Sequence, residues 1–402
     1  RFATQKFYML NKAIQKYLSN FKGFSREIWI LTLITFINRA GTMVLPFLSK
    51  YLKENDQSLL VDFVTAYDDQ GNPISNKAVS AAFDLKERID RMRSKTLKEL
   101  VDYTIRHFYA HLGAPSKEGY LQFFREVMLS TKKMLLDWQR VGFVHGVMNT
   151  DNLSILGLTI DYGPYGWLDN YDPNWTPNTT DASGRRYAYG RQPQIALWNL
   201  ARLAGALMPL VKSREALEAG LEHYRDTYAR HFRQSLAQKL GLQALDREGD
   251  TQAMETLFEL LSAAETDMTI FFRTLADVDD IGAVRAAIYE PEIFSSELSA
   301  RWNDWLQWRR DRIAAELKVD AALSMERRRE RMNAVNPCYV PRNYLLQLAI
   351  DAATQGDLAP LEELRQVLGN PYKKCESFER YAMRRPDWAR DRPGCSALSC
   401  SS

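Results

Sequence analysis

The stretch HGVMNTDNLSILGLTIDYGPYG, which runs from His145 to Gly166, decides the fold. It brings Asp151, Asn152 and Asp161 into one short segment, so three side chains with oxygen ligands follow a single His-Gly step. A carboxylate can accept or orient the proton of an incoming hydroxyl, and carboxylate and amide oxygens are typical ligands of hard cations such as Mg²⁺. The structural alternative is that Asp151 and Asn152 form an Asx-turn or helix cap and that Asp161 ends a strand.

Apolar residues on both sides of Gly157 predict a β-hairpin that turns at this glycine, with strands over Leu153–Leu156 and Leu158–Ile160. The order of a His-Gly loop, a loop Asn, a hairpin and then Ile-Asp resembles that of kinase-like phosphotransferases. In the aminoglycoside kinases this loop reads HGDxxxxN. This chain has Val147 at the position of that catalytic Asp, and a valine side chain cannot accept a proton. We therefore expect Asp151, further along the same loop, to take over this role.

The composition indicates a globular chain and excludes several classes of protein. Of the 402 residues, 46% are hydrophobic and 26% are charged, which is typical of folded domains. The 53 Lys and Arg against 50 Asp and Glu leave a net charge of +3, so no basic excess indicates a nucleic-acid-binding protein. The run Arg327–Arg331 is interpreted as a solvated helix face. Four scattered Cys and five His exclude a disulfide scaffold and a zinc site of paired ligands.

The front of the chain does not match the rest. We expect a basic and apolar helical segment of foreign character over 1–60, a connector over 61–93 and the main body over 94–402. The apolar run 28–48 follows a basic flank, which predicts a marginal single membrane span with its amino end in the cytoplasm. The alternative is a helix that packs on another domain. Residues 20–54 resemble the first membrane helix of major facilitator transporters, but we expect no transport because no second span follows.

From residue 94 onward, apolar residues recur at helical spacing, and Trp302, Trp305 and Trp308 predict a helix packed on the core. The expected fold is α+β and predominantly α: the carboxyl-terminal lobe of a protein-kinase-like fold with a helical carboxyl-terminal extension. The glycines that precede Gly142 are isolated from one another, so no phosphate-binding Gly-rich loop is recognised. We conclude that the motifs of the amino-terminal lobe are absent.

Longer segments of the main body resemble the selenoprotein O (SelO) family of protein adenylyltransferases over roughly residues 94–402. They are FREV from Phe124, HGVMNTDNLSILGLTIDYGPYGWLD from His145, GRRYAYGRQPQIALWNLARLA from Gly184, NPCYVPRNYLLQLAIDAA from Asn336, and the terminal CSALSCSS. The resemblance implies a kinase-like fold that binds ATP in a flipped orientation and transfers AMP to Ser, Thr or Tyr hydroxyls of proteins. It also implies that Asp151 is the catalytic residue, that Asn152 and Asp161 hold Mg²⁺, and that Asp161 thereby helps to bind the nucleotide.

The tail carries a further implication of the resemblance. Cys400 stands where eukaryotic members of the family place selenocysteine and many bacterial members place Cys, and Cys395 precedes it. These two thiols are candidates for a redox role, and an ordinary flexible tail with reduced thiols is the alternative. Elsewhere, Arg185 and Arg186 are candidates for contacting phosphates or a protein substrate, and the segment Trp198-Asn199-Leu200 is expected to anchor the helix that follows.

The expected function is Mg²⁺-dependent AMP transfer from ATP to protein hydroxyls, impaired in this chain because the amino-terminal lobe is not recognised. The alternative is a catalytically inactive, pseudokinase-type binding scaffold. The expected partners are ATP and protein substrates with hydroxyl side chains, with no nucleic acid and with membrane contact only through 28–48. The expected location is the cytoplasm, with a membrane tether if 28–48 inserts.

Overall fold

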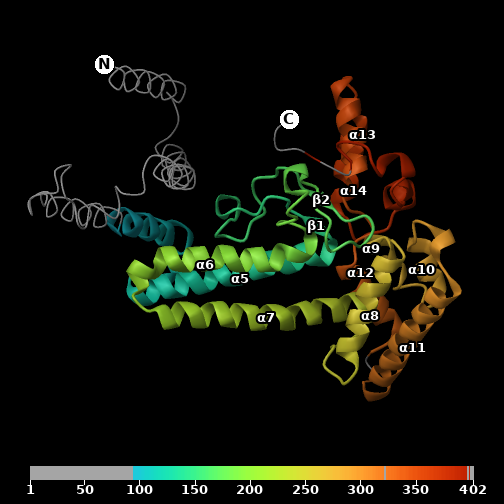
Figure 1. The fold of residues 1–402 in the computed structure, drawn as a ribbon, viewed down its shortest axis with the longest axis horizontal. Helices are drawn as coiled ribbons and strands as arrows, with labels where there is room; N and C mark the ends of the chain where they lie inside the picture. The colour runs from blue at the N-terminus through green and yellow to red at the C-terminus, as the bar shows by residue number, and fades with distance from the viewer. Residues whose placement is uncertain (1–93, 321–322, 396–397, 399–402) are drawn as a thin grey trace, which may run out of the picture. The chain divides into compact units, whose positions relative to one another are not determined.

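The computed structural model describes residues 94–320, 323–395 and 398. The chain divides into two compact units, Arg1–Leu97 and Lys98–Ser402, and the second unit is described here. The expected foreign segment, its candidate membrane span and the connector lie outside the described residues. In the second unit, residues 98–108 are helical and lead into the elements labelled in Figure 1.

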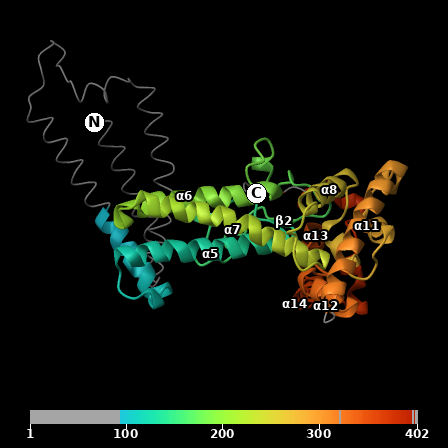
Figure 2. The same cartoon turned by 90° about the horizontal axis from the view of Figure 1, so that it is seen from below.

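Three long helices lie side by side: α5 (Lys117–Val141), α6 (Gln192–Val211) and α7 (Arg214–Leu240) (Figures 1 and 2). The side chain of Ser116 caps the start of α5, and Gly142 ends this helix in the left-handed conformation that glycine adopts at little cost. The apolar side chains of α5 recur on one face and are buried there: Tyr120, Phe123, Phe124, Val127, Met128, Met134, Leu135 and Trp138. Burial of this face joins the three helices into a bundle in which each contacts the other two.

The two strands in the described residues are β1 (Phe143–Val144) and β2 (Gly166–Trp167). They pair antiparallel, with Phe143 opposite Trp167. The pair closes a long loop that contains Asp151, Asn152 and Asp161, so the ends of this loop are fixed next to the carboxyl end of α5.

The predicted hairpin over Leu153–Ile160 is wrong, because this segment forms no paired strands. The turn at Gly157 is present, with φ at +67°. The Ile155 carbonyl, however, accepts the Tyr109 hydroxyl at 2.7 Å and the Ser130 hydroxyl at 3.3 Å instead of a strand partner. Hydrogen bonds from side chains therefore replace the ladder that a hairpin would need.

The largest core cluster lies among helices that follow α7. These helices are α8 (Asp250–Ala263), α9 (Met268–Thr274), α10 (Ile281–Ala287), α11 (Ser296–Val319) and α12 (Met325–Val335). Trp302 and Trp305 on α11 are buried and Trp308 is partly buried, which confirms a packed helix there. On α12 the arginine run is mostly exposed, as predicted, except that Arg328 is buried against Met332.

Two more helices, α13 (Asn343–Thr354) and α14 (Ala359–Gly369), pack on each other and on the tail around a separate core cluster. The predominantly helical fold is thus confirmed, and the kinase-like assignment stays a prediction. Within the described part of the chain, one helical stretch, Tyr189–Val211, has the length and composition of a membrane span. Much of it packs against α5 and α7, and core helices pass the same test, so it is weak evidence for a span.

Candidate functional site

His145 organises the centre of the site. Its Nε2 lies 2.8 Å from the Ile160 carbonyl, which can only accept, so this nitrogen carries the proton. Its Nδ1 then accepts the Val147 N–H at 3.4 Å. Burial lowers the pKa of His145, which favours the neutral ring that this donor–acceptor pattern requires. The ring also stacks on Trp138 of α5, at 5.5 Å between centroids. The His145 side chain thus contacts Val147 near the start of the loop, Ile160 near its end, and α5.

The glycine after this histidine is required by its surroundings. Gly146 has φ at +77°, and a Cβ added there would lie 2.1 Å from the Pro164 carbonyl oxygen. Any other residue would be strained by its backbone and would collide with backbone atoms that cannot rotate away. Asp161 also lies in the left-handed region, with φ at +54°, a conformation that Asp tolerates better than most residues.

Two of the predicted site segments are tied to the His-Gly step. Asn152 belongs to a short 3-10 helix, η2 (Thr150–Asn152), and its Nδ2 donates to the Val147 carbonyl at 3.0 Å. The structure therefore links Asn152 to Val147 and the residue before Asp161 to His145, so the two segments meet at the His-Gly step. Asp151 and Asp161 are exposed, and within the described residues their carboxylates make no hydrogen bond or ion pair.

This donor set fits a hard cation. The carboxylate oxygens of Asp161 carry no competing bond within the described residues, and the amide of Asn152 is oriented by its NH₂ group, which leaves its oxygen as the acceptor. In the part of the chain that the structure describes, no group of three or more His, Cys, Asp or Glu side chains could by itself hold a metal. A cation here would need further ligands from a bound molecule or water.

Side-chain amides from residues that follow β2 in the sequence hold the backbone of residues 143–148. Gln192, at the start of α6, accepts the His145 N–H at 3.0 Å and donates to the Phe143 carbonyl at 2.9 Å. Two turns further along the same face of α6, Asn199 donates to the Met148 carbonyl at 2.9 Å. Asn178 donates to the Gly146 carbonyl at 3.1 Å. We call Asn178, Gln192 and Asn199 the amide clamp.

Sequence reasoning missed the amide clamp. A signal was present, because Gln192 and Asn199 are polar residues on one face of an otherwise apolar helix, α6. Such residues are buried only where they have partners. The expectation for Trp198 is wrong: Asn199 and Leu200 are buried and anchor α6, but Trp198 is 41% exposed.

The loop before α6 is tied to the site loop. The buried carboxylate of Asp181 accepts the backbone N–H groups of Arg186 at 2.8 Å and Tyr187 at 2.7 Å. The Tyr187 hydroxyl then donates to the Asn149 side chain. Arg185 and Arg186 are exposed beside this contact, so the structure brings both predicted arginines to the rim of the site.

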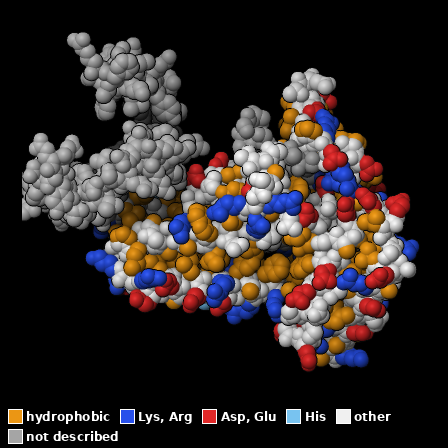
Figure 3. Space-filling view, in the orientation of Figure 1, with side chains coloured by type: hydrophobic (Ala, Val, Ile, Leu, Met, Phe, Trp, Pro, Cys, Tyr) orange, Lys and Arg blue, Asp and Glu red, His pale blue; other side chains and the backbone are white. Residues whose placement is uncertain are grey.

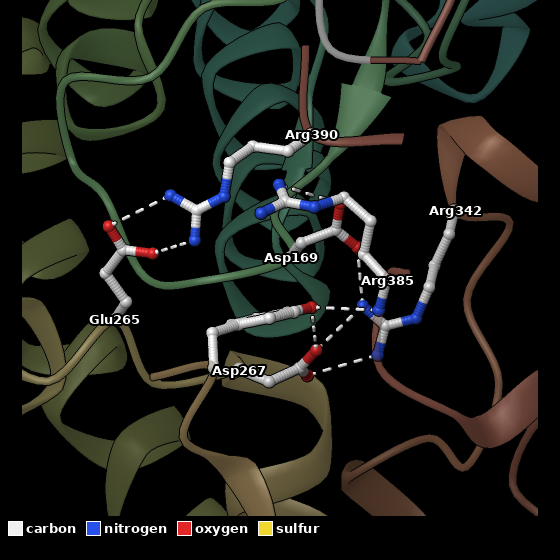
Figure 4. A network of polar contacts seen from close by, with 7 residues as sticks. Asp169, Glu265, Asp267, Arg342, Arg385 and Arg390 are labelled. Atoms are coloured by element: carbon white, nitrogen blue, oxygen red, sulfur yellow. Dashed lines mark hydrogen bonds and ion pairs between the residues drawn. The ribbon is translucent and has the colours of Figure 1, made fainter. Parts of the chain in front are cut away.

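The tail lies over a network of charges (Figure 4). Arg342 is buried between Asp169, at 2.6 Å, and Asp267, at 2.9 Å, and Arg390 pairs with Glu265 at 2.7 Å. These contacts join the residues after β2 to α13 and to the carboxyl-terminal segment.

Cys395 lines a pocket of about 240 Å³ beside this network. Its thiol is buried, and burial raises its pKa, which disfavours the reactive thiolate. Cys400 lies outside the described residues, so the redox role of the two cysteines stays a prediction. Just beyond Cys395, Leu398 donates its N–H to the Pro177 carbonyl at 2.7 Å and accepts the Thr179 N–H at 2.9 Å.

Comparisons with known proteins give one consistent result. The family model described as "Protein adenylyltransferase SelO" matches residues 83–369. The chain is 47% identical over 319 residues to a protein nucleotidyltransferase YdiU from Flavobacterium johnsoniae, covering 78% of this chain and 60% of that protein. It is 49% identical over 331 residues to the protein of the same name from Rhodopirellula baltica, covering 78% and 61%. The chain thus spans about 60% of the length of these curated relatives.

Proposed function

Because the chain belongs to the SelO family of protein adenylyltransferases, we propose that the loop between β1 and Asp161 is the metal- and hydroxyl-binding part of an AMP-transfer site. The substrates would be ATP and a Ser, Thr or Tyr hydroxyl of a protein. The observation that supports the proposal is the junction at His145, to which the segment of Asp151 and Asn152 is tied through Val147 and the segment of Asp161 through Ile160, with two exposed carboxylates that form no ion pair within the described residues.

Asp151 has the role of base or orienting group. In the transfer, the hydroxyl oxygen of the protein substrate forms a bond to the α-phosphorus of ATP. The bond between that phosphorus and the oxygen bridging to the β-phosphate breaks, and pyrophosphate leaves. The hydroxyl proton passes to the Asp151 carboxylate or is held by it until solvent takes it. An exposed carboxylate with no partner among the described residues is suited to this, because no competing bond must break first.

Asn152 and Asp161 would hold Mg²⁺ through their side-chain oxygens. When bound, the cation neutralises charge on the phosphates of the nucleotide. The chain's own contribution is position: the neutral His145 ring holds the Ile160–Asp161 step, and Val147 holds Asn152. Nucleotidyl transfer depends chiefly on positioning and electrostatics, so small displacements of these oxygens would reduce the rate strongly.

We expect this chain to be a poor enzyme. No Gly-rich loop is recognised among the residues before Gly142. Loss of one well-placed donor costs about 10²- to 10³-fold in rate. Val147, at the usual position of the catalytic Asp, also favours the second candidate, a binding scaffold that retains part of the site but does not transfer AMP.

Calorimetry of Mg²⁺-dependent ATP binding tests the metal assignment in the full chain. Asp161→Asn should abolish this binding and Asn152→Ala should weaken it. The matched control is Asp226→Asn, on the exposed surface of α7, and it should bind as the parent chain does. Unchanged binding in both site variants would overturn the metal assignment.

Self-labelling with isotopically labelled ATP and mass spectrometry of the AMP adduct test the reaction. Asp151→Asn should remove the adduct while nucleotide affinity stays within a few-fold. An adduct retained in Asp151→Asn would place the catalytic group elsewhere. ATP binding without any adduct in the parent chain would favour the scaffold.

A further inference from the structure

The segment between Asp181 and Glu215 carries only positive charge. It contains six basic residues and no acidic one: Arg185, Arg186, Arg191, Arg202, Lys212 and Arg214. Over the whole chain the two signs nearly balance, since the net charge is only +3. Figure 3 shows Lys and Arg side chains gathered on the face above α6. In this part of the chain, positive charge therefore gathers on the loop before α6 and on α6 itself.

The centre of this surface is an exposed aromatic ring. The guanidinium groups of Arg186 and Arg202 lie over the ring of Trp198, at 4.8 and 5.2 Å from its centroid. Trp198 is nevertheless 41% exposed. Neither arginine forms an ion pair with a carboxylate of the described residues. Positive charge and apolar area are thus both available to a partner at one place.

The loop that carries this surface is held in place although it is exposed. Asp181 fixes the backbone of Arg186, and Arg191 donates to the Gly184 carbonyl at 2.8 Å. Arg185 has φ at +47°, a strained conformation that persists only where the surroundings hold it. A pre-organised surface loses less conformational entropy when it binds a partner.

The surface also adjoins the proposed catalytic loop. Tyr187, the neighbour of Arg186, bonds Asn149, and Asn199, the neighbour of Trp198, bonds the Met148 carbonyl. Asn149 directly precedes the short helix η2, which carries Asp151. A peptide bound along the arginines would therefore have its adjacent residues close to Asp151.

We propose that Arg185, Arg186, Trp198 and Arg202, here called the Arg–Trp patch, bind an acidic segment of the protein substrate next to the hydroxyl that receives AMP. Arginine forms bidentate, charge-assisted hydrogen bonds with carboxylates, and Arg and Trp are enriched at binding hot spots. The patch is too small and the chain too nearly neutral for an extended polyanion. This inference rests on the proposed function, because it names the substrate class of the same site.

The test measures peptide binding directly, without AMP transfer. A fluorescein-labelled peptide with one Ser flanked by Glu residues is compared by anisotropy with the same peptide carrying Gln in place of Glu. The full chain should bind the Glu peptide at least about 10-fold more tightly than the Gln peptide. This preference should weaken steeply between about 50 and 200 mM salt, because exposed charges are screened.

Variants locate the binding. The pair Arg186→Glu and Arg202→Glu should reduce affinity for the Glu peptide by at least about 10-fold, and Trp198→Ala should reduce it a few-fold. The milder pair Arg186→Gln and Arg202→Gln covers the case in which charge reversal disturbs folding. The control pair Arg225→Glu and Arg233→Glu makes the same charge change on the exposed surface of α7 and should leave binding unchanged.

Calorimetry of Mg²⁺–ATP binding in the same variants separates the outcomes. Loss of peptide binding with unchanged ATP affinity in the Arg186/Arg202 variants supports the proposal. This result does not depend on how Asp161→Asn binds Mg²⁺–ATP, so failure of the metal assignment can be told apart from failure of the patch proposal. Equal losses for ATP and peptide would mean that the patch holds nucleotide phosphates and would overturn it. Equal affinity for the Glu and Gln peptides, or an oligonucleotide that binds more tightly than the Glu peptide, would overturn it as well.

Discussion

Replacement of Gln192 by leucine tests how the site loop is held. The buried Gln192 side chain satisfies the His145 N–H and the Phe143 carbonyl, and a leucine of similar size removes both bonds. An unpaired buried N–H at His145 costs about 1 to 3 kcal/mol. The Phe143 carbonyl also loses a hydrogen bond, and the net value of one such bond is about 0.5 to 1.5 kcal/mol. We therefore expect Gln192→Leu to lower the free energy of unfolding by about 1.5 to 4.5 kcal/mol.

Urea unfolding followed by circular dichroism measures this loss in the full chain. Gln194→Leu is the matched control, because Gln194 lies on the same turn of α6 but is exposed. It should change the free energy of unfolding by less than about 0.5 kcal/mol. A loss below about 1 kcal/mol in Gln192→Leu, or equal losses in the two variants, would refute the reasoning.

Three further predictions concern charge and protonation. Arg342→Met should lower the free energy of unfolding, measured in urea, by about 3 to 5 kcal/mol, because it leaves Asp169 and Asp267 without their shared buried cation. Changing both carboxylates to Asn in the same variant should recover much of this loss. Burial lowers the pKa of His145 below its ordinary value of 6.5, so the unfolded chain binds the proton more readily and stability should fall as pH drops below 6.5. The melting-temperature difference between the parent chain and His145→Gln should therefore narrow with acidification, and a constant difference would contradict this. A hydrogen bond with Ser377 lowers the pKa of the exposed Cys375 thiol, so iodoacetamide should label it faster and at lower pH than the buried cysteines of the described part; mass spectrometry of the peptides measures the order.

Periodicity predicted the helices because each buries a long apolar face, as α11 does with Trp302 and Trp305. It did not locate the strands, because strands as short as Phe143–Val144 have no period to detect. The hairpin prediction also failed for a physical reason. Leu156 and Leu158 look like strand residues, yet both side chains are exposed in the described unit. Hydrogen bonds from the Tyr109 and Ser130 hydroxyls hold the backbone carbonyl of Ile155, just before them.

The site was predictable where its residues are close in sequence. Asp151, Asn152 and Asp161 lie within one segment, and His145 and Val147 tie two parts of that segment together. The amide clamp was not predicted, because Asn178 and Gln192 reach the loop across a fold that sequence spacing does not reveal. Their chemical roles stay predictions.

The segment Pro177–Thr179 contacts both the carboxyl-terminal tail and the site loop. The tail therefore helps to support the site. Successive residues of an extended chain point in opposite directions. Pro177 and Thr179 use their backbone groups to hold Leu398, while the Asn178 side chain between them holds the Gly146 carbonyl. A shift of the tail would move the backbone from which Asn178 reaches the His-Gly step. Within the described unit, a continuous set of hydrogen bonds therefore joins the tail to the His-Gly step.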